Sequence, residues 1–324
     1  MEADARDPLA RIGTGTPLVS VVVPTHNRSG LLVLTLRSVL WQRGVDLEVL
    51  VVDDGSTDDT AEVVATLGDP RVRLLRHATP QGVSAARNRG VAAAAGRWLA
   101  FCDDDDLWAP DKLARQLAAA QATGRSWVYV GEVRIDRHGR IIAATSPPAP
   151  ERVAARLPHW NLVPGGCSSV MASRAALAVA GPFDTGLRNL ADWDLWIRLG
   201  RTGPPARVAG LLVAYRLHGG NASQDVAGVL AEADMLDHRD GVTVDRGDLA
   251  HYLGVLQLRS GRRRRALGHF ADAARHGKVM PAARAMTWIA RERLPRPPFG
   301  ARPARLGRRA RWRTEVEAWL AELR

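Results

Sequence analysis

The chain has 324 residues, of which 46% are hydrophobic and 24% are charged, a composition typical of a globular protein that buries a substantial core. The formal net charge is +11, and residues 225–324 hold 20 Lys and Arg against 12 Asp and Glu, so most of the positive excess belongs to the last third. The two cysteines exclude a disulfide framework, and no run approaches the roughly 20 apolar residues of a membrane-spanning helix.

After a loose tail over residues 1–17, apolar β-branched runs alternate with helical patterns. Strands are expected at 18–23, 47–52, 72–75, 97–102 and 127–130. Helices are expected at 29–43, 58–67, 83–95 and 110–122. This alternation predicts an α/β fold with a mostly parallel, doubly wound sheet. A smaller second half is expected to contain an edge hairpin over 134–143 and further elements at 170–180, 194–199 and 207–216.

Residues 225–324 have a different character, without clear strand signals. Helices are expected at 230–236, 249–258, 266–274 and 282–291, and the basic run Arg262–Arg265 falls between two of them. A Pro- and Arg-rich connector over 295–303 precedes a last amphipathic stretch around Trp312 and Trp319. The sequence therefore predicts an α/β domain over 18–224 followed by a basic helical region.

Two acidic clusters come directly after two of the expected strands. Asp53 and Asp54 follow the strand at 47–52, and Asp103–Asp106 follow the strand at 97–102. In open α/β sheets ligands bind outside the carboxyl ends of the strands, so both clusters are expected to line one crevice. Neighbouring carboxylates repel one another unless a cation or hydrogen-bond donors offset their negative charge. Mg²⁺ and Mn²⁺ are commonly bound by carboxylates together with substrate phosphates. A metal-dependent site is predicted.

Two other kinds of site fit these residues less well. The run from Asp53 to Thr57 loosely resembles the nucleophile motif of haloacid-dehalogenase-like phosphatases, but that motif has a second aspartate where Gly55 stands. A dinucleotide-binding site needs a Gly-rich turn after the first strand, whereas this chain has Pro24-Thr25-His26-Asn27-Arg28 there.

Six segments, in matching order and spacing, resemble the family 2 glycosyltransferases of GT-A fold over residues 18–224. They are Val21–Arg28, Val51–Asp58, Gly82–Asn88, Phe101–Asp106, Asp192–Leu199 and Tyr215–Asn221. The resemblance implies a Rossmann-like sheet flanked by helices. It also implies an inverting enzyme that moves a sugar from a nucleotide-diphosphate sugar, most often a UDP-sugar, to an acceptor hydroxyl.

The resemblance also assigns roles on the donor side. Asp54 matches the acid that holds the base or the ribose of the nucleotide, with Asp53 beside it. Pro24, Thr25 and Asn27 match the first nucleotide-binding loop, and Arg87 matches the helix that reaches towards that loop.

Further roles concern the metal and the proton transfer. Asp103, Asp104 and Asp105 fill the Asp-x-Asp motif, in which Asp105 is the principal ligand of Mn²⁺ or Mg²⁺ and Asp103 binds the ribose or a metal-bound water. His218 matches a position that faces the diphosphate or the metal. Asp192 matches the general base, which takes the proton of the acceptor hydroxyl.

The chain departs from the family pattern at two positions. Ala191 stands before Asp192 where the family usually has Glu, and His26 stands where Tyr is commoner. The missing carboxylate keeps open an alternative function, a degenerate and non-catalytic module that binds a nucleotide-sugar. Trp160 and Trp193 are candidates for stacking on a sugar, whereas Trp196, at helical spacing, is expected in the core.

The basic region has three interpretations. It is a solvated helical face, or it contacts an anionic membrane surface with Leu294, Trp312 and Trp319 at the interface, or it binds nucleic acid. No nucleic-acid-binding signature supports the third interpretation. The expected partners are a nucleotide-sugar donor and a glycan, lipid-linked or small-molecule acceptor. Residues 1–11 lack the apolar core of a secretion signal, and the expected location is the cytoplasm, with peripheral contact at the inner face of the membrane.

Overall fold

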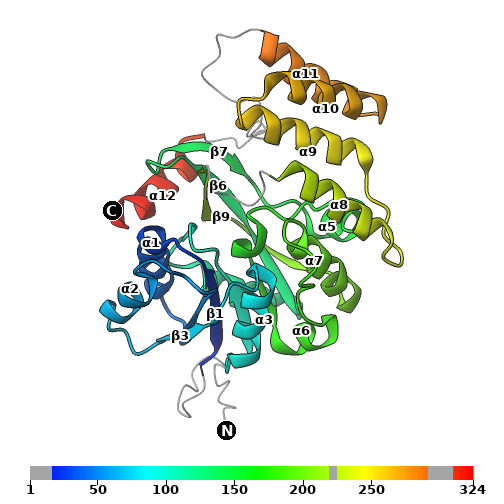
Figure 1. The fold of residues 1–324 in the computed structure, drawn as a ribbon. Helices are drawn as coiled ribbons and strands as arrows, with labels where there is room; N and C mark the ends of the chain where they lie inside the picture. The colour runs from blue at the N-terminus through cyan, green and yellow to red at the C-terminus, as the bar shows by residue number, and fades with distance from the viewer. Residues whose placement is uncertain (1–16, 219–224, 291–308, 324) are drawn as a thin grey trace.

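The structure, a computed structural model, describes residues 17–218, 225–290 and 309–323. Within these ranges nine strands form one sheet in the order β3-β2-β1-β4-β8-β6-β9-β5, with β7 paired to β6 (Figure 1). The strands are β1 (Val19–Thr25), β2 (Leu47–Asp53), β3 (Val72–Arg76), β4 (Trp98–Phe101), β5 (Leu107–Trp108), β6 (Trp127–Ile135), β7 (Ile141–Thr145), β8 (Val170–Ser173) and β9 (Ala206–Arg216). The prediction of an α/β fold is confirmed.

The sheet changes character halfway across. Strands β3, β2, β1 and β4 are parallel neighbours, as expected, and every residue of β1 and β2 is buried because helices cover both faces. The second half pairs β4 with β8, β8 with β6, β6 with β7 and β5 with β9 antiparallel, and only β6 with β9 parallel. Antiparallel pairing is therefore more extensive than the sequence suggested. The expected hairpin is the β6–β7 pair.

Strand β1 continues two residues beyond its expected end, through Pro24 to Thr25. Pairing with β4 reaches only as far as Val22, so Pro24 has a strand partner on one side alone, Val52 of β2. Its missing N–H therefore removes no ladder hydrogen bond. This extension carries the chain to the edge of the sheet, next to Asp53.

Helices form a layer on each face of the sheet (Figure 1). One layer packs against Val21, Val49 and their same-face neighbours, and the other packs against Val22, Leu50 and Phe101. The first layer consists of α1 (Ser29–Leu40), α4 (Lys112–Thr123) and α12 (Arg309–Glu322). The second consists of α3 (Val83–Ala93), α5 (Pro150–Arg156), α6 (Arg174–Ala180), α7 (Ala191–Thr202), α8 (Val226–Asp237) and α9 (Arg246–Arg259). The short helix α2 (Thr60–Thr66) lies beside α1.

The helices after residue 225 pack in three different parts of the structure. Helices α8 and α9 complete the core of the second layer, whereas α10 (Arg263–Arg275) and α11 (Val279–Ala290) pack with α9 around a separate small cluster that includes Phe270. Three of the four arginines of the basic run lie inside the first turn of α10, not between helices. Helices α8, α9 and α12 all bury apolar surface against the α/β core. The domain boundary expected at residue 224 stays a prediction.

The tryptophans of this chain serve mainly the core. Trp196 is buried and stacks on Trp127 at 6.2 Å between ring centroids, which confirms the expectation for it. The interpretation of Trp319 as a membrane-facing residue is wrong, because α12 turns Trp319 into the core against the sheet. Trp312 packs against the same cluster, and Leu294 lies outside the described residues. In the part of the chain that the structure describes, no helix is both long and apolar enough to span a membrane.

Candidate active site

The two acidic clusters meet at one edge of the sheet, as predicted. Strand β1 lies between β2 and β4, so the carboxyl ends of all three strands point the same way. The loop after β1 touches both clusters: Arg28 Nη1 lies 3.0 Å from Asp104 Oδ1 and 3.0 Å from Asp105 Oδ2. On the other side, the backbone N–H of Asn27 donates to Ser56 Oγ (2.9 Å) in the loop after β2. The β1 loop therefore joins the two clusters into one site.

Asn27 holds the first loop in place. Its φ of +54° lies in the left-handed region, which Asn tolerates better than most residues. Its side-chain oxygen accepts hydrogen bonds from the backbone N–H groups of Thr57 (2.7 Å) and Asp58 (3.3 Å). Pro24 and Thr25 are buried at the end of β1, directly before this loop. Asn27 thus shapes the predicted nucleotide-binding loop through contacts within the protein.

Asp54 is fixed by donors from another segment. His77 Nδ1 lies 2.7 Å from Asp54 Oδ1, the backbone N–H of Gln81 donates to the same oxygen (2.8 Å), and that of Gly82 donates to Oδ2 (2.8 Å). Burial alone would raise the pKa of Asp54, but these hydrogen bonds outweigh it and lower the pKa below the ordinary value. Nothing in the sequence pattern indicated His77 as a partner.

Asp53 is fully buried and stabilises the turn that follows it. Its Oδ1 accepts a hydrogen bond from the backbone N–H of Ser56 (2.8 Å), and Arg76 Nε lies 3.1 Å from Oδ2. Contact between Asp53 and a nucleotide stays a prediction.

The second cluster distributes its four carboxylates among different partners. Asp104 and Asp105 share Arg28, and His218 Nε2 lies 2.7 Å from Asp105 Oδ2. Burial and the neighbouring Asp105 raise the pKa of Asp104 to about 6, although Arg28 opposes this. Asp106, which sequence reasoning left without a role, is fully buried and accepts a hydrogen bond from the backbone N–H of Arg216 (3.1 Å). Asp106 thus ties the acidic loop to the end of β9.

Arg87 pairs with the acidic loop and lies near the predicted base. It projects from α3, which lies close to β1 because Gly90 leaves room for Val22: a Cβ at Gly90 would be 2.3 Å from Val22 Cγ1. Arg87 Nη2 lies 2.6 Å from Asp103 Oδ1, and its guanidinium packs over the Phe183 ring at 5.4 Å. Asp103 and Asp192 are both near enough to raise the pKa of Arg87 despite its burial. Contact between Arg87 and the nucleotide stays a prediction.

Asp192 lies in the first turn of α7, where an acid interacts favourably with the helix dipole. The backbone N–H of Trp193 donates to its Oδ1 (2.7 Å), and Oδ2 faces Gly166, where a Cβ would lie 3.5 Å away. Burial raises the pKa of Asp192 to about 6, although the Arg87 guanidinium opposes the shift. Asp194, the other acid of this turn, is paired with Arg198 at 2.6 Å, as expected of a structural contact. Asp192 is thus the carboxylate of α7 that remains for chemistry.

The fit of a divalent cation can be judged from the donor atoms. Among residues 17–218, 225–290 and 309–323, no group of three or more His, Cys, Asp or Glu has the arrangement of a metal centre. Asp105 Oδ2 and His218 Nε2 are 2.7 Å apart, close to the separation of about 3 Å between adjacent ligands with bonds of about 2.1 Å. This pair therefore fits two coordination positions, although Arg28 shares the Asp105 oxygen. Asp103 faces Arg87 instead.

Comparisons with known proteins indicate the family of this chain. A family model described as "Glycosyl transferase family 2" matches residues 20–178. The succinoglycan biosynthesis protein ExoO of Rhizobium meliloti (strain 1021) is 40% identical over 146 residues, which span 45% of this chain and 41% of that protein. The chain thus spans less than half the length of ExoO.

Two relatives from Escherichia coli are covered more completely. The UDP-Glc:alpha-D-GlcNAc-diphosphoundecaprenol beta-1,3-glucosyltransferase WfgD is 30% identical over 182 residues, which span 56% of this chain and 69% of that protein. WfaP, with the same activity in its name, is 28% identical over 214 residues, which span 64% of this chain and 80% of that protein.

Among solved structures, TarS 1–349 of S. aureus in complex with UDP-GlcNAc has the same fold. The TM-score is 0.54 with 16% sequence identity, over 80% of this chain and 81% of that chain. The fold, the matching family model and the coverage of WfgD lead to one conclusion. The chain belongs to the family 2 glycosyltransferases.

Proposed function

We propose that this glycosyltransferase moves a sugar from a UDP-sugar to a hydroxyl of a lipid-linked glycan acceptor, with inversion at the anomeric carbon. The observation that carries the proposal is the position of Asp192, a half-buried carboxylate of raised pKa, near Arg87, which pairs with Asp103 of the acidic loop at 2.6 Å. The names of WfaP and WfgD, which specify UDP-glucose and a diphosphoundecaprenol-linked sugar, support the substrate classes.

The donor nucleotide is proposed to bind at Asp54 and the loop after β1. Hydrogen bonds from the protein hold both oxygens of Asp54, but within the described residues Oδ2 accepts only the bond from Gly82. A carboxylate oxygen accepts two hydrogen bonds, so Oδ2 retains one acceptor position for a base N–H or a ribose hydroxyl. Asn27 keeps the facing loop in the shape that this contact requires.

The diphosphate is proposed to bind beside the acidic loop. Asp105 and His218 would hold Mn²⁺ or Mg²⁺ there, and the cation would neutralise charge that develops on the leaving diphosphate. Arg28, which contacts Asp104 and Asp105, adds a positive charge of the protein itself at the same place. A carboxylate-rich loop can in this way accept an anionic substrate.

Asp192 is proposed to take the proton from the acceptor hydroxyl as that oxygen attacks the anomeric carbon. A pKa of about 6 makes Asp192 a stronger base than an ordinary aspartate and still leaves it ionised at neutral pH. Ala191 is buried, so the position where the family usually has Glu is closed to solvent. We therefore assign proton transfer to Asp192 without a second acid from that position.

The alternative of a non-catalytic module is tested by turnover. Wild-type protein with UDP-glucose, Mn²⁺ and membrane extract as acceptor should release UDP at a rate that depends on both Mn²⁺ and acceptor. Calorimetry on the same sample should show that UDP binds more tightly with Mn²⁺ than with EDTA. Tight UDP binding without release from any UDP-sugar would favour the module.

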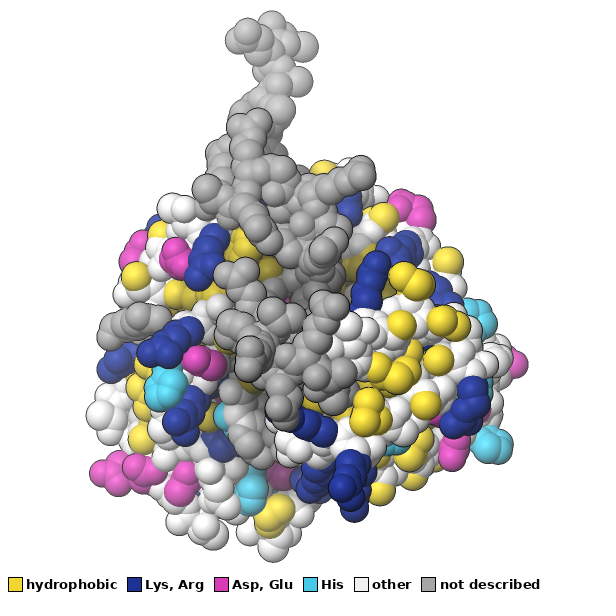
Figure 2. Space-filling view, turned by 90° about the horizontal axis from the view of Figure 1, so that it is seen from above, with side chains coloured by type: hydrophobic (Ala, Val, Ile, Leu, Met, Phe, Trp, Pro, Cys, Tyr) yellow, Lys and Arg dark blue, Asp and Glu magenta, His cyan; other side chains and the backbone are white. Residues whose placement is uncertain are grey.

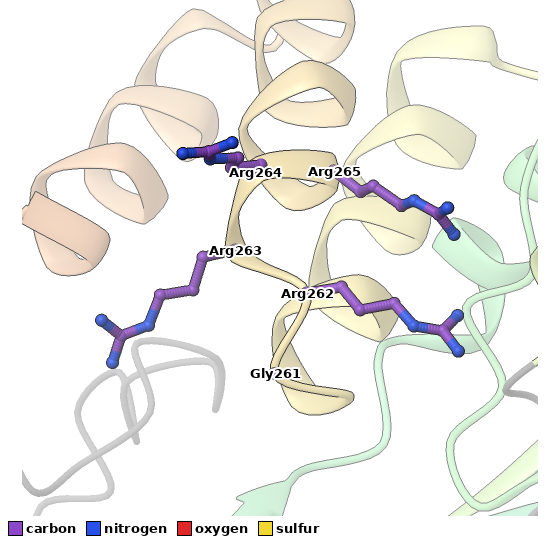
Figure 3. Close-up of a pocket in the computed structure, with 5 residues that line it drawn as sticks. All are labelled: Gly261, Arg262, Arg263, Arg264 and Arg265. Carbon is purple, nitrogen blue, oxygen red and sulfur yellow. The ribbon is translucent and has the colours of Figure 1, made fainter.

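We further propose that the start of α10 contacts an anionic membrane surface, where a lipid-linked acceptor would lie. Arg262, Arg263, Arg264 and Arg265 are all exposed and border an open hollow of about 560 Å³ (Figure 3). Arg262 and Arg265 extend to one side and Arg263 and Arg264 to the other. Figure 2 shows the basic side chains of the upper face in separate groups with hydrophobic side chains between them, a mixture suited to lipid headgroups.

Replacing Arg264 and Arg265 by Ala should weaken binding to phosphatidylglycerol vesicles by about 10-fold or more, since each basic residue near an anionic surface contributes about 1 kcal/mol. Flotation of the full-length protein with vesicles measures this. The control is Arg97→Ala with Arg125→Ala, which removes two exposed arginines before β4 and β6, at the opposite edge of the sheet. Equal flotation of both variants and the wild type would exclude the start of α10 as the contact.

A further inference from the structure

The segment that leads into the proposed base is held from two sides. Residues 183–190, which we call the base loop, lie between α6 and α7 and end directly before the helix that carries Asp192. On one side, α3 contacts this loop: the Asn88 side chain donates to the carbonyl of Phe183 and accepts from its N–H, both at 2.8 Å. On the other side, the base loop meets α8, which lies close to α7 (Figure 1).

On the side of α8, one buried carboxylate binds the last three residues of the base loop. Glu232 Oε1 accepts hydrogen bonds from the backbone N–H of Arg188 (2.9 Å) and from the side-chain amide of Asn189 (2.8 Å). Its Oε2 accepts from the backbone N–H groups of Asn189 (2.8 Å) and Leu190 (2.7 Å). The Glu232 side chain is only 6% exposed. Three successive backbone N–H groups and one amide thus converge on a single carboxylate.

The residue at the start of α7 provides no cap of its own. The N-cap is Leu190, whose side chain has no acceptor, and an anion at this end of a helix interacts favourably with the helix dipole. Glu232 forms no ion pair with the residues that the structure describes, so among them the N–H donors of the base loop offset its buried charge. Gly228, one turn earlier on α8, permits the close approach, since a Cβ there would lie 2.8 Å from Asn189 Nδ2.

The position of Asp192 depends on this arrangement. Asp192 follows Leu190 by two residues, and the N–H of Asp194 donates to the carbonyl of Leu190 (3.0 Å) in the first turn of α7. The peptide groups that Glu232 holds therefore fix where the helix begins and which way its first turn faces. A misplacement of about 1 Å can lower a reaction rate by about 100-fold, even when its cause lies far from the chemistry.

We propose that Glu232 is a positioning residue for sugar transfer, which fixes the base loop and thereby orients Asp192 towards the acceptor hydroxyl. This inference rests on the proposed function, because it requires Asp192 to be the base. It also gives the helical region after residue 224 a part in the active site, although the sequence pattern located that site within residues 18–224.

Glu232→Gln tests the proposal most directly. The amide has one oxygen, so in either orientation its NH₂ group faces N–H donors of the base loop and leaves at least one of them without an acceptor. Steady-state UDP release should show kcat lowered by about 10- to 100-fold. The affinity for UDP with Mn²⁺ should be unchanged, since no described hydrogen bond joins Glu232 to the residues proposed to bind the nucleotide. The control is Asp234→Asn, an exposed acid of the same helix that pairs with Arg246, and it should keep wild-type kcat.

A double-mutant cycle separates positioning from a general loss of structure. If Glu232 acts through Asp192, the combination of Glu232→Gln with Asp192→Asn should have the same kcat as Asp192→Asn alone. A merely structural role would lower kcat by the same factor in both backgrounds, and that result would overturn the proposal. Wild-type kcat in Glu232→Gln would overturn it as well.

Asn189→Asp provides a second variant in case Glu232→Gln does not fold. It replaces a donor to Glu232 by another carboxylate, and repulsion between the two should displace the base loop and lower kcat by about 10-fold or more. Thermal unfolding and UDP binding show whether each variant is folded, and wild-type kcat in the folded Asn189→Asp protein would contradict the proposal. Wild-type kcat in Asp192→Asn alone would instead refute the proposed function, whatever the effect of Glu232.

Discussion

Asp192→Asn is expected to lower kcat by about 10²- to 10⁴-fold while leaving the affinity for UDP unchanged, because the amide cannot take the proton of the acceptor hydroxyl. The substitution keeps the shape of the side chain, and the amide oxygen can still accept the hydrogen bond from the Trp193 N–H. It also removes a half-buried negative charge, so the folded state should be at least as stable as that of the wild type. The measurements are steady-state UDP release, calorimetry with UDP and thermal unfolding.

A matched control for this substitution is Asp240→Asn, which changes an exposed aspartate between α8 and α9 in the same way. Its kcat should equal that of the wild type. If Asp192→Asn also retains wild-type kcat, the base lies elsewhere and the assignment of Asp192 is wrong.

The same carboxylate sets the expected pH dependence. Since burial raises the pKa of Asp192 to about 6, kcat/KM of the wild type should fall about tenfold per pH unit below pH 6, and the residual rate of Asp192→Asn should lack this decline. Protonation of Asp192 cannot lower kcat/KM by unfolding the protein. A carboxyl with a raised folded pKa binds protons more tightly in the folded state, so Asp192 adds stability as the pH falls from 6 towards 4. Asp104 titrates in the same range, and UDP affinity measured at each pH separates its effect.

Asp105→Ala is the second substitution with a large expected effect. It should abolish the difference in UDP affinity between Mn²⁺ and EDTA and lower kcat by about 10³-fold, because a cation at the leaving diphosphate supplies several kcal/mol of charge stabilisation. The protein should stay folded, since Asp105 raises the pKa values of the buried Asp104 and Asp106 and its removal relieves that repulsion. Calorimetry with UDP, with and without Mn²⁺, gives the direct readout.

Asp111→Ala provides the control, because it removes an acid a few residues further on that is half exposed and pairs with Arg115. This variant should keep the metal dependence of UDP binding. Unchanged metal dependence of UDP binding in Asp105→Ala would show that Asp105 is not a metal ligand. Arg28 would then be the group that neutralises the charge of the diphosphate.

The sequence predicted the edge of the sheet well, for a physical reason. Apolar runs that end in Asp53 and Asp103 indicate buried parallel strands, and parallel strands deliver their carboxyl ends to one place. It could not predict how the side chains there would pair. The contacts of Asp54 with His77 and of Asp103 with Arg87 depend on loop conformations that no residue pattern specifies.

The last helix shows another limit of sequence reasoning. A stretch with Trp312 and Trp319 on one face has the same pattern whether that face meets lipid or protein, and here α12 buries Trp319 and Val316 against the sheet. Similarly, the alternation of apolar runs did not distinguish parallel from antiparallel pairing in the second half. There, the direction of β8 is set by the chain path through a short 3₁₀ turn over Gly166–Ser169.

The central claim is that one site gathers Asp54, Asp105 and Asp192 around a sugar donor. A crystal structure of the full-length protein with UDP and Mn²⁺ tests it most directly. We expect the uracil or ribose beside Asp54, an anomalous Mn²⁺ peak on Asp105, and the β-phosphate on the side of the site that faces Asp192. A Mn²⁺ peak away from Asp105, or UDP bound outside the edge formed by β1, β2 and β4, would contradict it.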